Sequence, residues 1–199
     1  MAHISQETRD LIRPGAERSA RILAPFLVEE LGLSAGAKVL DVGCGEGFLC
    51  HEFRSLGIEA YGVDGDHLPG VDQVVDLRQP LGMHSFDAAC CLEVGEHLPD
   101  SAAEVLVDSL CAAAPYIAFS AAIPGQGGPG HVNEQWPSYW ASKFRERGRS
   151  VTGTSRYKIW GDPGLEPWYK QNLLLVGVGD GPCLSLIHPV VWSFHKGLG

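Results

Sequence analysis

One aspartate and three glycines stand at regular spacing in a segment that can bind a ligand through its backbone. In VLDVGCGEGF, Asp41 is followed by Gly43, Gly45 and Gly47, so a glycine occupies every second position. Glycine adopts positive φ at little cost and lets a ligand lie against the main chain. The free N–H groups at the start of a following helix bind anionic or polar groups. The pattern predicts a ligand-binding turn between a buried strand and a helix.

The spacing of these glycines separates two kinds of nucleotide-binding turn. A dinucleotide turn has the form GxGxxG, whose third glycine would fall where Phe48 stands, and no P-loop lysine follows. The DxGxGxG form resembles the first motif of class I S-adenosylmethionine-dependent methyltransferases. The resemblance covers residues 38–120 motif by motif and the rest of the chain more loosely. It implies that Asp41, Cys44 and the backbone of Gly43–Gly47 face the methionyl part of S-adenosylmethionine.

Acidic residues at the ends of the next apolar runs extend this resemblance. IEAYGVD ends at Asp64, where a carboxylate can accept both ribose hydroxyls, and Gly65 follows it. Asp66 competes for the same role, and a surface aspartate that caps a turn is the structural alternative for Asp64. The family commonly binds adenine through an acid and a backbone N–H at the end of the third strand. These positions are Asp76 and Leu77 in VDQVVDL.

A further acidic cluster follows the next apolar run, in SFDAACCLEVGEHLP. It resembles the family's fourth motif, the strand that ends beside the reactive sulfonium. The resemblance assigns Glu93 to the cofactor and places Glu96 and His97 on the wall of the pocket, where His97 can contact substrate. An imidazole at a helix start that bonds to local backbone is an equally good interpretation of His97.

The chemistry of this family sets what else the site needs. The methyl group on a sulfonium is an electrophile, so its transfer is an in-line displacement that needs no metal ion and no covalent enzyme intermediate. An acceptor hydroxyl or ammonium must still lose its proton, and a base with a pKa near the operating pH favours histidine.

His131 in GPGHVNEQW is the expected catalytic base. It follows the fifth strand-like run, on the side of the sheet where open α/β folds bind ligands. The surrounding glycines predict a loop that closes over substrate. Asn133 and Gln135 are expected to orient the acceptor and Trp136 to form a wall. The alternative for His131 is an exposed loop residue. The H-x-N segment before an aromatic helix resembles small methyltransferases of bacterial natural-product and sugar pathways.

Alternating elements must position these residues. Apolar runs over 37–43, 58–64, 72–77, 85–93, 115–122 and 172–179 predict strands, and segments 16–32, 46–57, 101–114 and 136–148 have helical periodicity. Pro25 is expected to kink or split the first helix. Strands alternating with helices predict a parallel sheet. With the resemblance, the expected fold is a single α/β domain with a Rossmann-like, mostly parallel seven-stranded sheet and helices on both faces.

The expected domain, residues 1–199, divides into three parts. These are an N-terminal helical segment over 1–35, a cofactor-binding half over 36–121 and a substrate-side half over 122–199. Segment 149–170 lacks a regular strand pattern.

Composition narrows the class of partner. The chain has 15 Lys and Arg against 24 Asp and Glu, a formal net charge of −9, which argues against nucleic acid. The six cysteines lack a metal-type or disulfide spacing and are expected to be reduced. The N-terminus has no signal-peptide core, and no apolar run reaches the length of a membrane span. We therefore expect a cytoplasmic protein with a small-molecule acceptor. The sequence does not predict an oligomeric state.

These observations predict methyl transfer from S-adenosylmethionine to an oxygen or nitrogen atom of a small molecule of natural-product or sugar type. Two alternatives stay open at this level. One is other sulfonium chemistry on the cofactor itself, such as intramolecular cyclisation. The other is a protein that binds the cofactor without catalysis.

Overall fold

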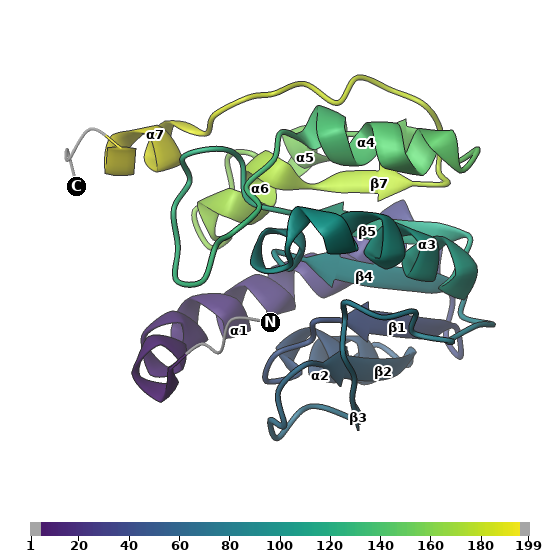
Figure 1. Ribbon diagram of the computed structural model, residues 1–199. Coiled ribbons are helices and arrows are strands. Elements are labelled where there is room, and N and C mark those ends of the chain that lie inside the picture. The colour runs from purple at the N-terminus through teal and green to yellow at the C-terminus, as the bar shows by residue number, and fades with distance from the viewer. Residues whose placement is uncertain (1–4, 196–199) are drawn as a thin grey trace.

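The computed structural model describes residues 5–195, in which seven strands form one sheet (Figure 1). The strand order is β3-β2-β1-β4-β5-β7-β6. Strands β1 to β5 are parallel to one another, whereas β7 is antiparallel to both β5 and β6. This confirms the predicted Rossmann-like, mostly parallel sheet. The strands are β1 Lys38–Val42, β2 Glu59–Asp64, β3 Gln73–Val74, β4 Ala88–Leu92, β5 Tyr116–Ser120, β6 Val151–Thr152 and β7 Leu174–Val176.

Helices pack on both faces of the sheet, each against its own apolar cluster. α3 and α4 bury side chains with Cys91 on one face, and α1 and α2 do so with Cys90 on the other. Neighbouring residues of a strand point to opposite faces, which explains this division. No helix in the described part of the chain is long and apolar enough to span a membrane. The helices are α1 Gln6–Glu30, α2 Phe48–Ser55, α3 Ala103–Ala113, α4 Pro137–Glu146, α5 Arg156–Ile159, α6 Pro167–Asn172 and α7 Pro189–His195, with 3-10 turns at Gly95–His97 and Asp100–Ala102.

The first helix is longer than predicted and continues through Pro25. A proline inside a helix costs about 3 kcal/mol. Leu23 and Leu27 flank it and are 2% and 0% exposed, and burying each contributes about 1.5–3 kcal/mol. This packing offsets the cost, so Pro25 does not split the helix, which was one of the two predicted outcomes. At the other end, the Ser5 side chain accepts a hydrogen bond from Thr8 N and caps the helix.

The sheet departs from the sequence prediction on both sides of its centre. The third strand is limited to Gln73–Val74, so it ends two residues before Asp76. The strand predicted at 172–179 covers only Leu174–Val176 and lies between β5 and β6. β6 forms the edge with two residues from the segment that lacks a strand pattern. From β7 the chain runs back across the top of Figure 1 to α7.

Candidate functional site

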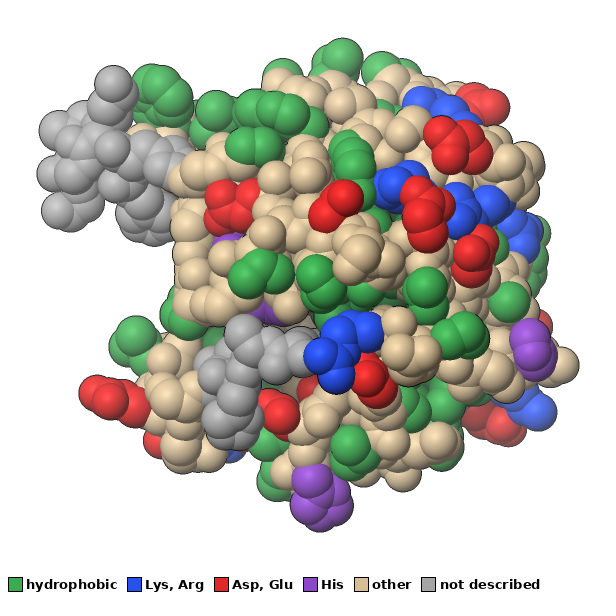
Figure 2. Space-filling view, in the orientation of Figure 1, with side chains coloured by type: hydrophobic (Ala, Val, Ile, Leu, Met, Phe, Trp, Pro, Cys, Tyr) green, Lys and Arg blue, Asp and Glu red, His purple; other side chains and the backbone are tan. Residues whose placement is uncertain are grey.

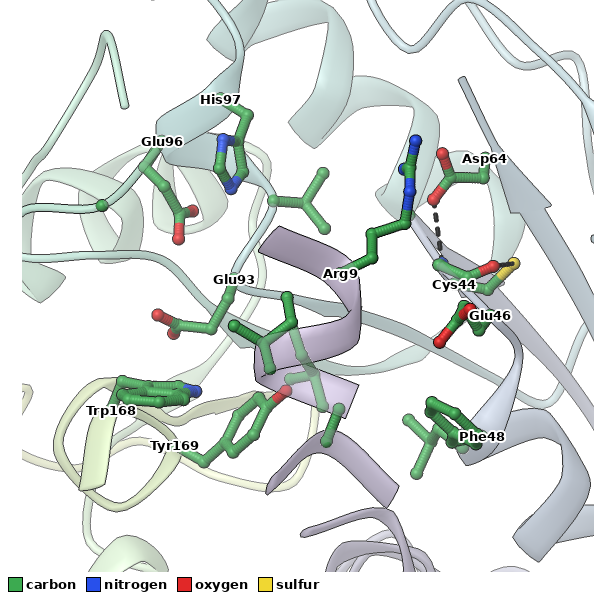
Figure 3. A pocket seen from close by; sticks show the side chains of 18 of the residues that line it. Arg9, Cys44, Glu46, Phe48, Asp64, Glu93, Glu96, His97, Trp168 and Tyr169 are labelled. Atoms are coloured by element: carbon green, nitrogen blue, oxygen red, sulfur yellow. Dashed lines mark hydrogen bonds between the residues drawn. The ribbon is translucent and has the colours of Figure 1, made fainter. Parts of the chain in front are cut away.

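A pocket of about 400 Å³ lies at the carboxyl ends of β1, β2 and β4. Its wall is built by the N-terminal half of α1, the glycine turn, the ends of β2 and β4, loop 126–131 and α6. Figure 2 shows the recess on the left of the molecule. In Figure 3, Glu93, Glu96 and His97 lie at one end of the pocket, and Cys44, Glu46 and Asp64 lie at the other. Ligand pockets in proteins usually have volumes of about 300–1,000 Å³.

The glycine turn exposes its backbone to this pocket, as its spacing predicts. Gly43, Gly45 and Gly47 all have positive φ, at 76°, 55° and 75°. A Cβ at Gly47 would lie 2.7 Å from Gly70 Cα, so close backbone packing requires glycine there. A Cβ at Gly45 would meet no atom within 4 Å, because this residue faces open space in the pocket wall. Gly47 shapes the turn, and Gly45 leaves room for a ligand against the main chain.

Asp64 joins the end of β2 to this turn. Its carboxylate is 3% exposed, and each oxygen accepts one backbone hydrogen bond. Oδ2 accepts from Gly45 N at 2.9 Å, and Oδ1 accepts from Asp66 N at 2.9 Å. A carboxylate oxygen accepts about two hydrogen bonds, so each retains a free lone pair for a ligand hydroxyl. The geometry suits the ribose contact predicted from the sequence.

Asp41 is buried at the start of the turn and also lines the pocket. Burial is the main reason why the pKa of Asp41 rises to about 7, and the nearby Asp64 carboxylate adds to it. The Cys50 thiol opposes the shift, since its Sγ donates to Asp41 Oδ2 at 3.5 Å. Cys44, the other thiol beside the turn, lines the pocket, and burial raises its pKa as well.

Replacing Asp41 by asparagine is expected to change how stability depends on pH. Because the folded pKa is raised, the folded chain keeps a proton that the unfolded chain releases between about pH 4 and pH 7. The stabilisation from this group is therefore fully present below about pH 4 and is lost as the pH rises to 7. Relative to the native chain, Asp41→Asn should raise the free energy of unfolding by roughly 2–3 kcal/mol more at pH 8 than at pH 5.

Denaturant unfolding at the two pH values checks this expectation. Asp87→Asn is the matched control, because Asp87 is exposed and accepts a backbone hydrogen bond from Lys38 N at 2.7 Å. A stability difference for Asp41→Asn that is the same at pH 5 and pH 8 would contradict the assignment.

Two arginines of α1, which sequence reasoning missed, fix that helix over the pocket. Arg9 Nη1 lies 3.1 Å from Asp66 Oδ2, and Arg13 Nη2 lies 2.6 Å from Glu46 Oε1. Thr8 and Ile12 contribute to the same wall. The only local signal was their helical spacing, which the prediction did not extend before residue 16.

Three predicted cofactor residues lie outside the pocket wall. Asp76 is exposed and accepts from Arg78 Nε and Nη2 at 2.8 and 2.9 Å. This bidentate pair lowers the pKa of Asp76 to about 2. Leu77 is buried in the apolar core, and Gly65 is not part of the lining. Asp76 and Leu77 follow the early end of β3 and do not line the pocket, and their adenine contacts remain a prediction.

Glu93 connects the end of β4 to the second half of the chain. Its backbone has a φ of 56°, an uncommon value for a residue other than glycine, and its N–H donates to Ser120 O at 2.9 Å. The carboxylate accepts from Gln126 Nε2 and Asn172 Nδ2, each at 3.1 Å. Burial raises the pKa of Glu93 despite these bonds. Strained backbone of this kind is concentrated at functional sites.

The histidines predicted from the sequence meet beside Glu96. The rings of His97 and His131 are 4.9 Å apart and nearly perpendicular. Burial, followed by the neighbouring His131, lowers the pKa of His97. His131 Nδ1 lies 2.8 Å from Glu134 Oε1, and the Glu134 carboxylate accepts from Gly125 N and Gly127 N at 2.7 Å. His131 therefore lies in the pocket wall and is oriented by an acid, not free in an exposed loop.

The other residues predicted on the substrate side take structural positions. Asn133 is buried and accepts from Gln135 Nε2 at 3.1 Å, and Trp136 is the N-cap of α4. None of the three lines the pocket. Trp168 and Tyr169 of α6 form the wall in their place (Figure 3). The irregular sequence before β7 gave no signal for these two.

This sheet, with the glycine turn and Asp64 at its carboxyl edge, defines a class I S-adenosylmethionine-dependent methyltransferase. Residues 15–170 match the family model described as a methyltransferase domain, and the chain belongs to this family. The open Gly45 backbone and the buried Asp64 carboxylate fit the family's cofactor, S-adenosylmethionine.

Curated relatives and solved structures agree with this assignment. A ubiquinone biosynthesis O-methyltransferase from Rhodopseudomonas palustris is 26% identical over 159 residues, which are 71% of this chain and 55% of the relative. A relative of the same name from Pseudomonas aeruginosa is 36% identical over 98 residues, 40% of this chain and 41% of the relative. The chain spans 37–55% of the length of such relatives.

Solved structures show the same fold. Magnesium protoporphyrin IX methyltransferase from Synechocystis, with bound S-adenosylmethionine, superposes with a TM-score of 0.61 at 21% identity, over 88% of this chain and 85% of that one. A 1,6-didemethyltoxoflavin-N1-methyltransferase from Burkholderia thailandensis gives 0.58 at 18% identity, over 85% and 80%.

Proposed function

We propose that this chain transfers the methyl group of S-adenosylmethionine to an oxygen or nitrogen atom of a small-molecule acceptor. One observation carries the proposal: the glycine turn with Asp64 and the acid-oriented His131 face the same pocket from opposite ends. The names of similar proteins support it, because they include an O-methyltransferase and an N1-methyltransferase acting on small molecules. A net charge of −9 agrees with a partner other than nucleic acid.

The residues of the chain divide the work between binding and proton transfer. The bound cofactor supplies an electrophilic methyl group on its sulfonium. Asp64 and the Gly45 backbone bind the ligand and fix its orientation, and a near-attack geometry of this kind is worth up to about 7–11 kcal/mol. His131 donates its Nδ1–H to Glu134, so Nε2 carries the lone pair that accepts the acceptor's proton. Glu134 fixes this tautomer, as acids do for catalytic histidines.

The acceptor side is formed by segments that are far apart in the sequence. Loop 126–131 and α1 cover the pocket, and we assign its aromatic wall to Trp168 and Tyr169. We also propose that residues 36–121 form the cofactor half and residues 122–199 the substrate half. The N-terminal helical segment over 1–35 contributes α1 to the wall of the pocket. A cytoplasmic location is also proposed, supported by six unpaired thiols.

A single-turnover assay with purified protein, S-adenosylmethionine and pools of hydroxyl and amine acceptors tests the function. We expect S-adenosylhomocysteine above background, because methyl transfer leaves the thioether on the cofactor. Methylthioadenosine as the product would indicate cyclisation of the cofactor's own chain. Cofactor binding without either product across all pools would indicate a non-catalytic protein.

A further inference from the structure

Three metal-binding side chains meet at the acceptor end of the pocket. Glu96, His97 and His131 offer one carboxylate oxygen and two ring nitrogens, and these atoms lie within 4.8 Å of one another. One carboxylate with two imidazoles is a ligand set that zinc and divalent transition-metal ions use in proteins. Figure 3 shows Glu96 and His97 side by side at this end of the pocket.

Two candidate ligand atoms of this cluster are buried without a hydrogen-bond partner in the described part of the chain. Glu96 is 1% exposed and its Oε2 has no partner among the described residues, and the same holds for Nδ1 of His97. A buried polar atom left unpaired costs about 1–3 kcal/mol. Two such atoms from adjacent residues, in the wall of one pocket, point to a ligand that satisfies both.

The other contacts of the two histidines leave His97 Nδ1 and His131 Nε2 available to bind an ion. The His97 ring bonds to the backbone of Gly130, and Nδ1 has no partner. His131 donates from Nδ1 to Glu134, which directs its Nε2 away from that acid. Histidine ligands of metal ions almost always donate their other N–H to a carboxylate or a carbonyl oxygen in this way.

Charge favours a cation at the same place. Glu93 and Glu96 are close enough to repel, and in the part of the chain that the structure describes neither forms an ion pair with lysine or arginine. The amide side chains of Gln126 and Asn172 satisfy the hydrogen bonds of Glu93 without supplying a positive charge.

We propose that Glu96, His97 and His131 bind a zinc or divalent first-row transition-metal ion, with a coordination position open to the acceptor oxygen. Ligand bonds of 2.0–2.2 Å require these atoms to approach one another by about 1 Å. The site rests on the proposed function and differs from the sequence expectation of a metal-free reaction. In this site His131 Nε2 binds the ion through its lone pair and does not accept the proton directly.

The ion then takes over activation of the acceptor. A hydroxyl bound to it loses its proton to water more readily, because the positive charge lowers the hydroxyl pKa. The oxygen lone pair forms the bond to the methyl carbon while the carbon–sulfur bond breaks, and the electrons of that bond stay on sulfur.

Metal binding is tested directly with Co²⁺. Protein stripped with EDTA and dialysed is titrated with Co²⁺ and followed by visible absorption and calorimetry. We expect one ion per chain. Glu96→Gln and His97→Ala should each lower the affinity by at least about 100-fold, and Glu134→Gln, which changes only the partner of a ligand, by about 10–100-fold. His51→Ala is the matched control, because His51 is exposed on α2 and its loss should leave binding unchanged.

The outcomes are distinct. Saturable binding that is lost in Glu96→Gln and His97→Ala, with melting curves showing both variants folded, supports the site. No saturable binding to the native chain, or binding in both variants equal to the native chain, overturns it.

Assays of methyl transfer by the metal-free protein then test the role of the ion separately from the proposed function. Activity that returns only with Zn²⁺, Mn²⁺ or Co²⁺ supports a role of the ion in transfer. Full activity of the stripped protein in EDTA overturns that role, while the proposed function stands with His131 as the direct proton acceptor. If no S-adenosylhomocysteine forms under any condition, the proposed function fails, and the Co²⁺ titration still decides the metal site.

Discussion

Replacing Asp64 by alanine is expected to lower the affinity for S-adenosylmethionine by at least about 100-fold. The substitution removes the proposed ribose contact and leaves Gly45 N–H and Asp66 N–H without their carboxylate acceptor. A hydrogen bond to a charged group contributes about 1.5–3 kcal/mol, so the loss of the two proposed bonds from the ribose hydroxyls corresponds to at least about 3 kcal/mol of binding free energy. Since about 1.4 kcal/mol is a tenfold change, this predicts the 100-fold effect. Titration calorimetry with S-adenosylhomocysteine and with S-adenosylmethionine measures it.

The matched control is Asp87→Ala. Asp87 also accepts a backbone hydrogen bond, from Lys38 N at 2.7 Å, but at the opposite end of β1. Its replacement should leave cofactor affinity unchanged. An Asp64→Ala variant that folds and binds within threefold of the native chain would exclude Asp64 from the cofactor site.

Replacing His131 by alanine is expected to lower kcat by about 10²–10⁴-fold, the usual contribution of a general base. Cofactor affinity should change little, because the glycine turn and Asp64 lie at the other end of the pocket (Figure 3). A loss of kcat is expected whether His131 takes the proton itself or binds an ion. The metal titration described above distinguishes the two roles.

Gly128→Ala offers a second test of the same group. A Cβ at Gly128 would lie 2.4 Å from His131 Nε2 and would displace the ring without removing it. We expect a smaller loss of kcat, with cofactor affinity retained. His51→Ala is the control for the loss of an exposed imidazole. Unchanged kcat in both His131→Ala and Gly128→Ala would refute a catalytic role for His131.

Local patterns in the sequence predicted the cofactor end of the site. Asp41, the glycines after it and Asp64 all lie at strand ends, and the strands were visible as short apolar runs. Position at the end of a parallel strand is sufficient to bring such residues to one edge of the sheet. The same reasoning placed His131 correctly, since its loop follows β5.

The acceptor end depends on contacts between distant segments. Glu93 bonds to Asn172, 79 residues away, and Arg9 pairs with Asp66 across 57 residues. No local periodicity encodes such pairs. The apolar run that ends at Asp76 did not show that β3 stops at Val74, and the adenine contact of Asp76 stays a prediction.

The charge of Asp64, at the cofactor end of the pocket, affects product release. Arg9 and Arg13 are paired with Asp66 and Glu46, so no arginine pair neutralises Asp64 or Glu93 in the described part of the chain. The methyl donor carries a positive sulfur, and the product that remains after transfer is a neutral thioether. The buried Asp64 carboxylate attracts the first more strongly than the second. Loss of the positive charge on sulfur weakens binding of the product. The electrostatics of the pocket therefore favour exchange of the product for a new molecule of S-adenosylmethionine.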